Sequence, residues 1–140
     1  ALVGHSMGGL AARSSLRAFG DAAVACVVTL GTPHRGTVHA NFGRGRNVRQ
    51  MRRDSDWLRA LAAEEPGGRL ERFTVVLSWQ DNLVAPQAIQ TLPGARTVVL
   101  HGLGHVTLAY DARVAGIVLE ALAAAETGRT AREATPGEIG

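Results

Sequence analysis

The sequence predicts an α/β fold with a mostly parallel sheet of about four strands and flanking helices. Three observations lead to this prediction. Four short apolar runs are continuous rather than alternating, which is typical of strands buried on both faces of a parallel sheet. Segments of helical composition lie between the runs, and glycine, proline or aspartate marks most boundaries. Because strands alternate with helices, right-handed crossovers are expected between them.

The expected strands are rich in valine and leucine. They comprise residues 1–4 (ALVG), 24–30 (VACVVTL), 73–78 (FTVVLS) and 97–102 (TVVLHG). Cys26 lies in the second run and is expected to be a small buried side chain. As the single cysteine of the chain, it cannot form an internal disulfide.

The first two expected helices have recognisable ends. The first covers residues 7–19 and is ended by a Gly-Asp pair. The second covers residues 55–63, and either Asp54 or Ser55 is a suitable N-cap. A Pro-Gly-Gly sequence that begins at Pro66 is expected to stop this helix.

The last expected helix covers residues 111–125. Its apolar residues recur at helical spacing and form one face, namely Val114, Ile117, Val118, Ala121 and Leu122. The polar tail 126–140 contains glycine and proline and is expected to be flexible. Residues 31–53 have no strong period and are expected to form a long, partly irregular insertion. The sequence therefore predicts one domain over residues 1–125.

Composition and charge exclude several classes of protein. Hydrophobic residues make up 46% of the chain, which excludes intrinsic disorder. No apolar run approaches the ~20 residues of a membrane-spanning helix. All basic side chains are arginine, and the formal net charge is +3. Five arginines are close in sequence: Arg44, Arg46, Arg49, Arg52 and Arg53.

A cluster of five arginines is compatible with binding to nucleic acid or to an anionic lipid surface. Apart from Phe42, no aromatic side chain lies among them for base stacking, and no nucleic-acid-binding module is recognisable. We therefore expect an exposed basic face and no nucleic-acid partner. Contact with a lipid surface stays an alternative.

The start of the chain carries the pattern Gly-x-Ser-x-Gly, formed by residues 4–8 at an expected strand–helix junction. A serine exposed on so tight a turn needs a positive φ, which costs about 1–3 kcal/mol. Glycine at positions 4 and 8 is expected because the strand and helix backbones nearly touch there. The amide of Met7, at the helix N-terminus, would face a developing oxyanion. Ser6 is thus a candidate nucleophile, and the alternative is an incidental serine in a glycine-rich turn.

A nucleophilic serine needs a histidine base and an acid that orients it. When the serine comes first, the acid and then the histidine follow on loops after later strands. Asp81 follows the third expected strand, and His105 follows the fourth. The order Ser6, Asp81, His105 therefore matches this arrangement, and the three positions together are a stronger signal than the serine pattern alone.

Other histidines and acids have simpler interpretations. His101 lies within or at the end of the last strand and is the main competitor as base. Asp54, Asp56 and Asp111 lie at expected helix starts, where capping accounts for them. His34 and His39 lie in the irregular segment without a third ligand at useful spacing, so the sequence predicts no metal site and no cofactor.

Taken together, four motifs resemble the α/β-hydrolase superfamily. They are LVGHSMGGLAAR, VVTLGTPHRGT, DSDWLRAL and GLGHVTL, with a strand between the last two that is followed by Asp81. More narrowly, the chain is similar to bacterial triacylglycerol lipases and esterases and to lipase-like relatives that carry Gly-Thr-Pro-His-x-Gly after the strand following the nucleophile. The similarity extends to about residue 125.

The resemblance implies roles for particular residues. Ser6 would be the nucleophile, Asp81 the acid and His105 the base, with one oxyanion donor from the backbone of Met7. Residues 31–65 would form a lid-side insertion over the acyl pocket. Residues near the substrate would be His5, beside the serine, together with Thr32 and Pro33.

The implied function is hydrolysis of carboxylic esters, with lipid-like acyl esters as small-molecule substrates. A thioesterase or acyltransferase using the same triad, or a non-catalytic remnant that binds a partner or lipid, are the alternatives.

The chain departs from the family pattern at its beginning. Such hydrolases form several strands before the nucleophile turn, whereas only residues 1–4 precede it here. We therefore expect a partial α/β-hydrolase fold that corresponds to the C-terminal half of the domain. A bare strand edge would favour oligomerisation or aggregation. A second oxyanion donor outside the chain predicts weak or absent turnover by the chain alone.

Overall fold

A four-stranded parallel sheet forms the centre of the molecule. The computed structural model describes residues 1–20, 22–63 and 67–134. The strands are β1 (Leu2–His5), β2 (Val27–Leu30), β3 (Phe73–Ser78) and β4 (Arg96–Leu100), and they lie side by side in the order β1-β2-β3-β4. All three neighbouring pairs are parallel. The predicted fold class and the four predicted strands are therefore confirmed.

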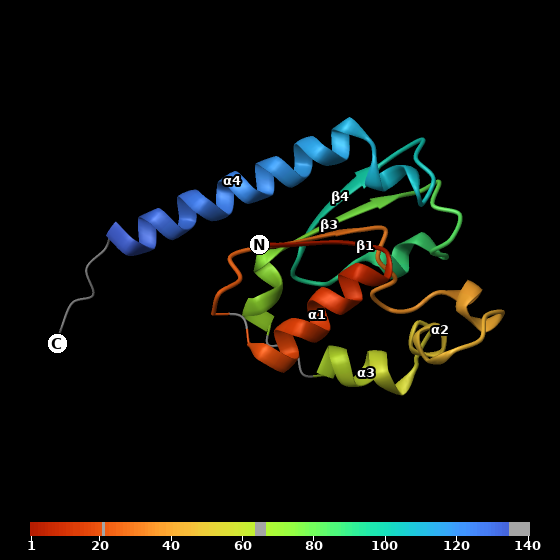
Figure 1. The fold of residues 1–140 in the computed structure, drawn as a ribbon. Helices are drawn as coiled ribbons and strands as arrows, with labels where there is room; N and C mark the ends of the chain where they lie inside the picture. The colour runs from red at the N-terminus through yellow and green to blue at the C-terminus, as the bar shows by residue number, and fades with distance from the viewer. Residues whose placement is uncertain (21, 64–66, 135–140) are drawn as a thin grey trace.

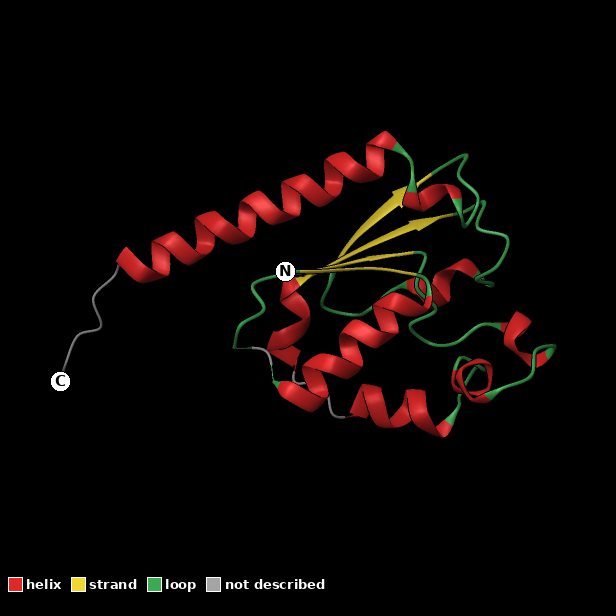
Figure 2. Ribbon diagram, viewed as in Figure 1, coloured by secondary structure: helices red, strands yellow, loops and turns green. Residues whose placement is uncertain are grey.

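Helices cover both faces of this sheet, as Figure 1 shows. On one face α1 (Met7–Phe19) packs against β2 and β3 through a cluster that includes Leu16, Val27 and Phe73. On the other face α4 (Ala112–Ala134) packs through Val114 and Ala121. The helix α3 (Asp56–Ala63) lies against the outer side of α1. Figure 2 shows the same layers, with the strands in yellow between the helices in red.

The parallel register brings the loops that follow the strands to one edge of the sheet. His5 pairs with Leu30, Leu30 with Val76, and Ser78 with Leu100. The chain leaves β1, β3 and β4 at these positions and enters the segments that carry Ser6, Asp81 and His105. The fold thus gathers the three predicted catalytic residues at the carboxyl end of the sheet.

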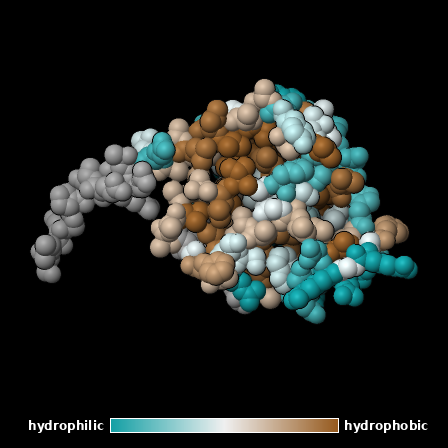
Figure 3. Space-filling view, viewed as in Figure 1, coloured by the Kyte–Doolittle hydropathy of each residue, from teal (hydrophilic) through white to brown (hydrophobic). Residues whose placement is uncertain are grey.

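The outer strands are less buried than their sequences predict. Every residue of β2 and β3 is buried, as expected for strands with neighbours on both sides. In β1 and β4, however, Val3 is 51% exposed and Val99 is 42% exposed. Each of these two strands has a partner on one side only within the sheet. Hydrophobic surface accordingly gathers beside α4 on the face shown in Figure 3.

Two other features differ from the sequence-based expectation. The insertion 31–53 contains a 3-10 helix, η1 (Val38–Asn41), and a short helix, α2 (Arg46–Gln50). The last helix continues to Ala134, beyond residue 125, where we expected it to end. Alanine, glutamate and arginine are good helix formers, and they outweigh a single glycine in this tail. The expected tail residues 135–140 lie outside the described part of the chain, as does Pro66.

Three further 3-10 helices connect the main elements: η2 (Gly67–Arg72), η3 (Gln87–Gln90) and η4 (Thr107–Ala109). None of the helices in the described ranges is both long and apolar enough to cross a membrane.

Candidate active site

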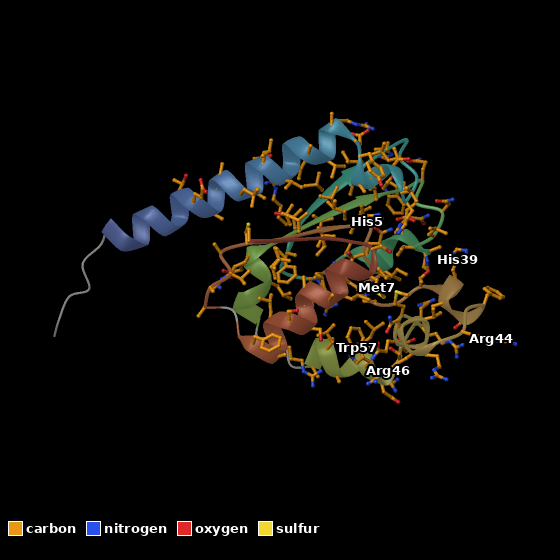
Figure 4. The ribbon with its side chains drawn as sticks, viewed as in Figure 1. His5, Met7, His39, Arg44, Arg46 and Trp57 are labelled. Atoms are coloured by element: carbon orange, nitrogen blue, oxygen red, sulfur yellow. The ribbon has the colours of Figure 1, made fainter. Side chains whose placement is uncertain are left out.

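Ser6 occupies a strained turn between β1 and α1. Its backbone has φ 54° and ψ −123°, a conformation that L-residues other than glycine rarely adopt. The Ser6 amide donates to the carbonyl of Leu30, and the Ser6 carbonyl accepts from the amide of Gly9 at 3.2 Å. Figure 4 shows His5 and Met7 on the two sides of this turn. Both neighbouring elements therefore hold Ser6 in a costly conformation.

The glycines around Ser6 differ in whether the structure has room for a side chain. A Cβ on Gly4 would lie 2.5 Å from the Gly9 nitrogen, so glycine is required there, as predicted. A Cβ on Gly8 would meet nothing within 4 Å, so the predicted steric reason does not hold at that position. The restriction falls instead on Gly9, where a Cβ would lie 2.2 Å from the hydroxyl oxygen of Thr32.

Thr32 holds the serine turn from the neighbouring strand. Its side chain is fully buried, and its hydroxyl donates to the Ser6 carbonyl at 2.9 Å. We predicted Thr32 as a residue of the substrate pocket, and the hydrogen bond gives it a supporting contact to the serine backbone. Pro33 beside it is buried and begins a tight turn, in which its carbonyl accepts from the Gly36 amide at 2.9 Å.

Asp81 is completely enclosed by hydrogen-bond donors. One carboxylate oxygen accepts from the amides of Leu83 and Val84 at 2.9 and 2.8 Å. The other accepts from His105 Nδ1 at 2.8 Å and from Gln90 Nε2 at 3.3 Å. Burial raises the pKa of the Asp81 carboxyl, but the hydrogen bonds from His105, Val84 and Leu83 outweigh burial and lower this pKa overall. Asp81 is therefore an ionised carboxylate at neutral pH.

His105 has the tautomer that a general base needs. Because Asp81 is ionised, Nδ1 of His105 carries the ring proton and donates a hydrogen bond to the Asp81 carboxylate. In this tautomer Nε2 has a free lone pair. The His105 backbone is held on two sides, since its carbonyl accepts from His5 Nε2 at 2.9 Å and its amide donates to Asn82. The rings of His5 and His105 lie 4.7 Å apart between centroids.

The contact with His5 brings the His105 loop next to the residue that precedes Ser6. Within the described part of the chain, however, the Ser6 hydroxyl makes no hydrogen bond to His105. Catalytic hydrogen bonds are often long or poorly aligned before substrate binds, so this geometry is compatible with a serine–histidine pair. The structure thus joins Asp81 to His105 directly and places Ser6 at the same edge.

Met7 is the first residue of α1 and is 43% exposed. The first amides of a helix have no partner inside the helix, so the Met7 amide is available to an anion beside Ser6. The predicted oxyanion donor therefore has a suitable position. His5, also predicted to lie near the substrate, is half-buried between β1 and the His105 loop.

Gly31 and Gln90 lie against the Asp81–His105 pair, and neither was among the residues predicted from the sequence. Gly31 has φ +56°, and a Cβ there would lie 3.1 Å from Asp81 Oδ2 and 3.2 Å from His105 Nδ1. Gln90 is fully buried, and its amide nitrogen also donates to the carbonyl of Val84. The position of Gly31 in the Gly-Thr-Pro-His motif could have marked it, whereas nothing local marks Gln90.

The competing histidines have other environments. His101 is exposed, and His39, also exposed, donates from Nδ1 to the carbonyl of Leu83 at 3.2 Å. His34 is buried between Arg13 and Thr29, whose hydroxyl oxygen lies 3.0 Å from His34 Nε2. Burial, and next the positive charge of Arg13, hold the pKa of His34 well below its usual value. His34 is therefore a neutral, structural histidine.

Of the three acids interpreted as capping residues, one caps a helix and two do not. Asp111 accepts from the amide of Arg113 at the start of α4. For α3 the cap is Ser55, whose hydroxyl accepts from the amide of Leu58. Among the residues that the structure describes, no group of three or more histidine, cysteine, aspartate or glutamate side chains is placed to hold a metal ion.

A hollow of about 620 Å³ lies elsewhere in the molecule. It is lined by Ala1, residues 22–25 and Arg72, which precede β1, β2 and β3, and by Leu122 of α4. It therefore lies at the amino end of the strands, away from the edge that carries Ser6.

A parallel sheet with a serine on a strand–helix turn, and with a buried aspartate–histidine pair at the same edge, is an arrangement of the α/β-hydrolase type of fold. The chain belongs to the PGAP1-like alpha/beta domain family, which matches residues 1–78. This match includes the Ser6 turn and ends before Asp81 and His105. The predicted relationship to α/β hydrolases is thereby confirmed.

A solved structure of similar fold supports this assignment. The mature form of the Bacillus licheniformis lipase BlEst2 superposes with a TM-score of 0.62 at 17% sequence identity. The superposition covers 74% of this chain and 58% of the lipase, so the chain spans little more than half of that protein. At this identity the likeness establishes the fold. A search of curated proteins found no match.

Proposed function

We propose that the chain is a serine hydrolase of carboxylic esters, with Ser6 as nucleophile, His105 as general base and Asp81 as the acid that orients the base. The observation that carries the proposal is the buried Asp81–His105 hydrogen bond, 2.8 Å long, at the same sheet edge as the strained Ser6 turn. Strain at a non-glycine residue persists where surrounding structure holds it, and such residues cluster at active sites.

The proposed reaction begins when Nε2 of His105 takes the proton of the Ser6 hydroxyl. The Ser6 oxygen then bonds to the ester carbonyl carbon, and the carbonyl electron pair moves to its oxygen, beside the Met7 amide. When this intermediate collapses, His105 gives its proton to the departing alcohol. Water attacks the acyl-enzyme in the same way, with His105 taking a proton from the water and returning one to Ser6. Asp81 stabilises the imidazolium at each stage.

The substrate class follows from the surface around the site. Met7, Leu83 and Val106 are 43%, 47% and 59% exposed and flank the three proposed catalytic residues in sequence. This apolar surrounding favours an ester with a hydrocarbon-rich acyl chain over a small polar ester. The fold likeness to a lipase agrees with this choice.

Covalent labelling by a fluorophosphonate probe tests the proposal. The Ser6 oxygen would displace fluoride from phosphorus, and this step needs only the activated nucleophile. We expect labelling of the chain, none in Ser6→Ala, and labelling slowed by about 10²–10⁴ in Asp81→Asn and His105→Gln. The matched control is His101→Gln, which alters an exposed histidine near the end of the same strand and should label normally.

Labelling that persists in Ser6→Ala, or that is equal in His101→Gln and His105→Gln, would contradict the assignment. If the probe labels Ser6, rates for p-nitrophenyl esters of increasing chain length and for an acyl-CoA separate ester from thioester hydrolysis. We expect the longer esters to be preferred.

A further inference from the structure

The positive charge of the chain is concentrated in one segment. Seven of the 15 arginines and two of the acidic residues lie between positions 35 and 59, so this segment carries a formal charge of +5 and the remainder −2. The segment contains η1, α2 and the first half of α3. We call it the arginine lobe. In Figure 3 hydrophilic surface gathers over this part of the molecule, at the lower right.

Four guanidinium groups of the arginine lobe have no internal role. Within the described part of the chain, the side chains of Arg44, Arg46, Arg49 and Arg53 are exposed and make no hydrogen bond or ion pair. By contrast, Arg52 donates to the carbonyl of Ala40 and so supports the loop. Figure 4 shows Arg44 and Arg46 at the outer edge of the lobe. Like charges this close repel one another, and an external anion would relieve the repulsion.

The arginine lobe also has an open hollow with a volume of about 440 Å³. Its lining includes Arg46, Arg49, Arg52, Arg53, Ser55 and Trp57, together with one acidic residue, Asp56. Several cationic groups thus face a common space that admits an anionic headgroup.

Exposed apolar side chains occur within the arginine lobe and in the segments that follow the strands. Phe42, within the arginine lobe, is 87% exposed. Others follow the carboxyl ends of the strands and form what we call the apolar rim: Met7, Trp79, Leu83, Val106 and Tyr110. Arginine beside exposed aromatic and aliphatic side chains is the combination that binds a charged lipid surface, where the cations meet headgroups and the apolar groups enter the interface.

Hydrogen bonds connect the arginine lobe to the apolar rim and to the catalytic acid. The Leu83 carbonyl accepts from the Thr37 hydroxyl at 3.1 Å and from His39 Nδ1 at 3.2 Å. The Leu83 amide donates to Asp81 at 2.9 Å, and the Ala85 amide donates back to Thr37. Leu83 therefore connects the arginine lobe to the loop that carries Asp81. A surface that binds the lobe would also meet this loop.

We propose that the arginine lobe and the apolar rim dock together on the surface of a lipid bilayer that carries anionic headgroups. Docking would place the edge that carries Ser6 against the bilayer, and in this respect the inference rests on the proposed function. The binding itself needs no catalysis. A bilayer suits the surface better than nucleic acid, because Phe42 has no neighbouring exposed aromatic in the lobe on which successive bases could stack.

Co-sedimentation with vesicles tests this proposal. Large vesicles of phosphatidylcholine alone, and with about 30% phosphatidylglycerol, are compared at about 0.05 M and about 0.5 M salt. We expect binding to the anionic vesicles to exceed binding to neutral vesicles at least tenfold at low salt, and this preference to shrink at high salt. Equal binding to both vesicles would overturn the proposal.

A pair of double variants locates the charge that matters. Arg46→Gln with Arg49→Gln removes two unbonded guanidiniums of the lobe, and Arg96→Gln with Arg113→Gln removes two that pair with Glu120 and Asp111. Both variants change the net charge by the same amount. We expect the lobe variant to bind anionic vesicles about tenfold more weakly and the control to bind nearly as the parent. Equal losses would show that net charge acts without the lobe, and would overturn the proposal.

Two further arms complete the experiment. Phe42→Ser should weaken vesicle binding at both salt concentrations, because it removes an apolar contact and no charge. Stronger binding of the parent to a DNA duplex than to anionic vesicles would overturn the proposal in favour of nucleic acid. Ser6→Ala should bind vesicles as the parent does, so loss of probe labelling and loss of vesicle binding report separately on the two proposals.

Discussion

The strain in the Ser6 turn predicts that two variants lacking the Ser6 hydroxyl differ in stability. Ser6 has φ 54° and ψ −123°, and holding a non-glycine residue there costs roughly 1–3 kcal/mol. Ser6→Gly removes this cost, whereas Ser6→Ala keeps the Cβ and therefore the strain. Glycine loses more conformational freedom on folding than alanine, which offsets about 0.4–1 kcal/mol of the gain. With mid-range values of about 2 and about 0.7 kcal/mol, Ser6→Gly should therefore be more stable than Ser6→Ala by roughly 1.3 kcal/mol.

Thermal or urea unfolding followed by circular dichroism measures this difference. For a chain of this size we expect the thermal midpoint to differ by about 4 °C for each kcal/mol. Neither variant should react with a fluorophosphonate, so the comparison isolates the backbone from the chemistry. Ser15, an exposed residue of α1, supplies the matched control. There the order should reverse, with Ser15→Ala more stable than Ser15→Gly by about 1 kcal/mol.

Equal stability of Ser6→Gly and Ser6→Ala, with the expected reversal still present at Ser15, would refute this account of the turn. Ser6 would then sit in its turn without strain. Backbone strain would then give no reason to assign Ser6 a catalytic role.

The remaining predictions concern glycine, histidine and glutamine positions. Gly4→Ala should destabilise the fold by about 3 kcal/mol, because its Cβ would meet backbone atoms, whereas Gly8→Ala should leave stability unchanged or raise it by up to ~1 kcal/mol in urea unfolding. His34 is neutral when folded and gains a proton when unfolded, so stability should fall as the pH drops below about 6.5, and less steeply in His34→Gln. Gln90→Met removes a donor to Asp81 together with an unpaired buried oxygen, so it should slow probe labelling several-fold while changing the unfolding free energy by less than about 1 kcal/mol.

Local patterns were sufficient to predict the elements that form the site. The helix α1 begins and ends at the predicted residues 7 and 19, because a strained serine turn precedes it and Gly20, with φ 78°, follows it. The four strands were predictable from continuous apolar runs bounded by turn residues. The same signal did not distinguish central strands from outer strands, because burial depends on how many neighbours a strand has and not on its own composition.

Contacts between segments that are distant in sequence could not be predicted from these local patterns. Gln90 donates to Asp81 through a short 3-10 helix whose sequence, Gln-Ala-Ile-Gln, has no motif. His34 was placed only in the irregular segment, yet it is buried and contacts Arg13 of α1. In the same way, Gly8 occupies a pattern position without a steric need, and Gly9 has that need because of Thr32. Each of these assignments depends on a residue more than eight positions away or on a partner from another element.

The residues that follow β2 contact both the Ser6 turn and the Asp81–His105 pair. β2 lies between β1 and β3, and the two residues that follow it face opposite neighbours. Gly31 lies against the Asp81–His105 hydrogen bond, while the Thr32 hydroxyl holds the Ser6 carbonyl. A side chain at position 31 would therefore press on the aspartate–histidine pair, and loss of the Thr32 hydroxyl would loosen the serine turn. Two adjacent residues thus contact both the Ser6 turn and the Asp81–His105 pair, which accounts for a glycine followed by a small hydroxyl residue at this point of the chain.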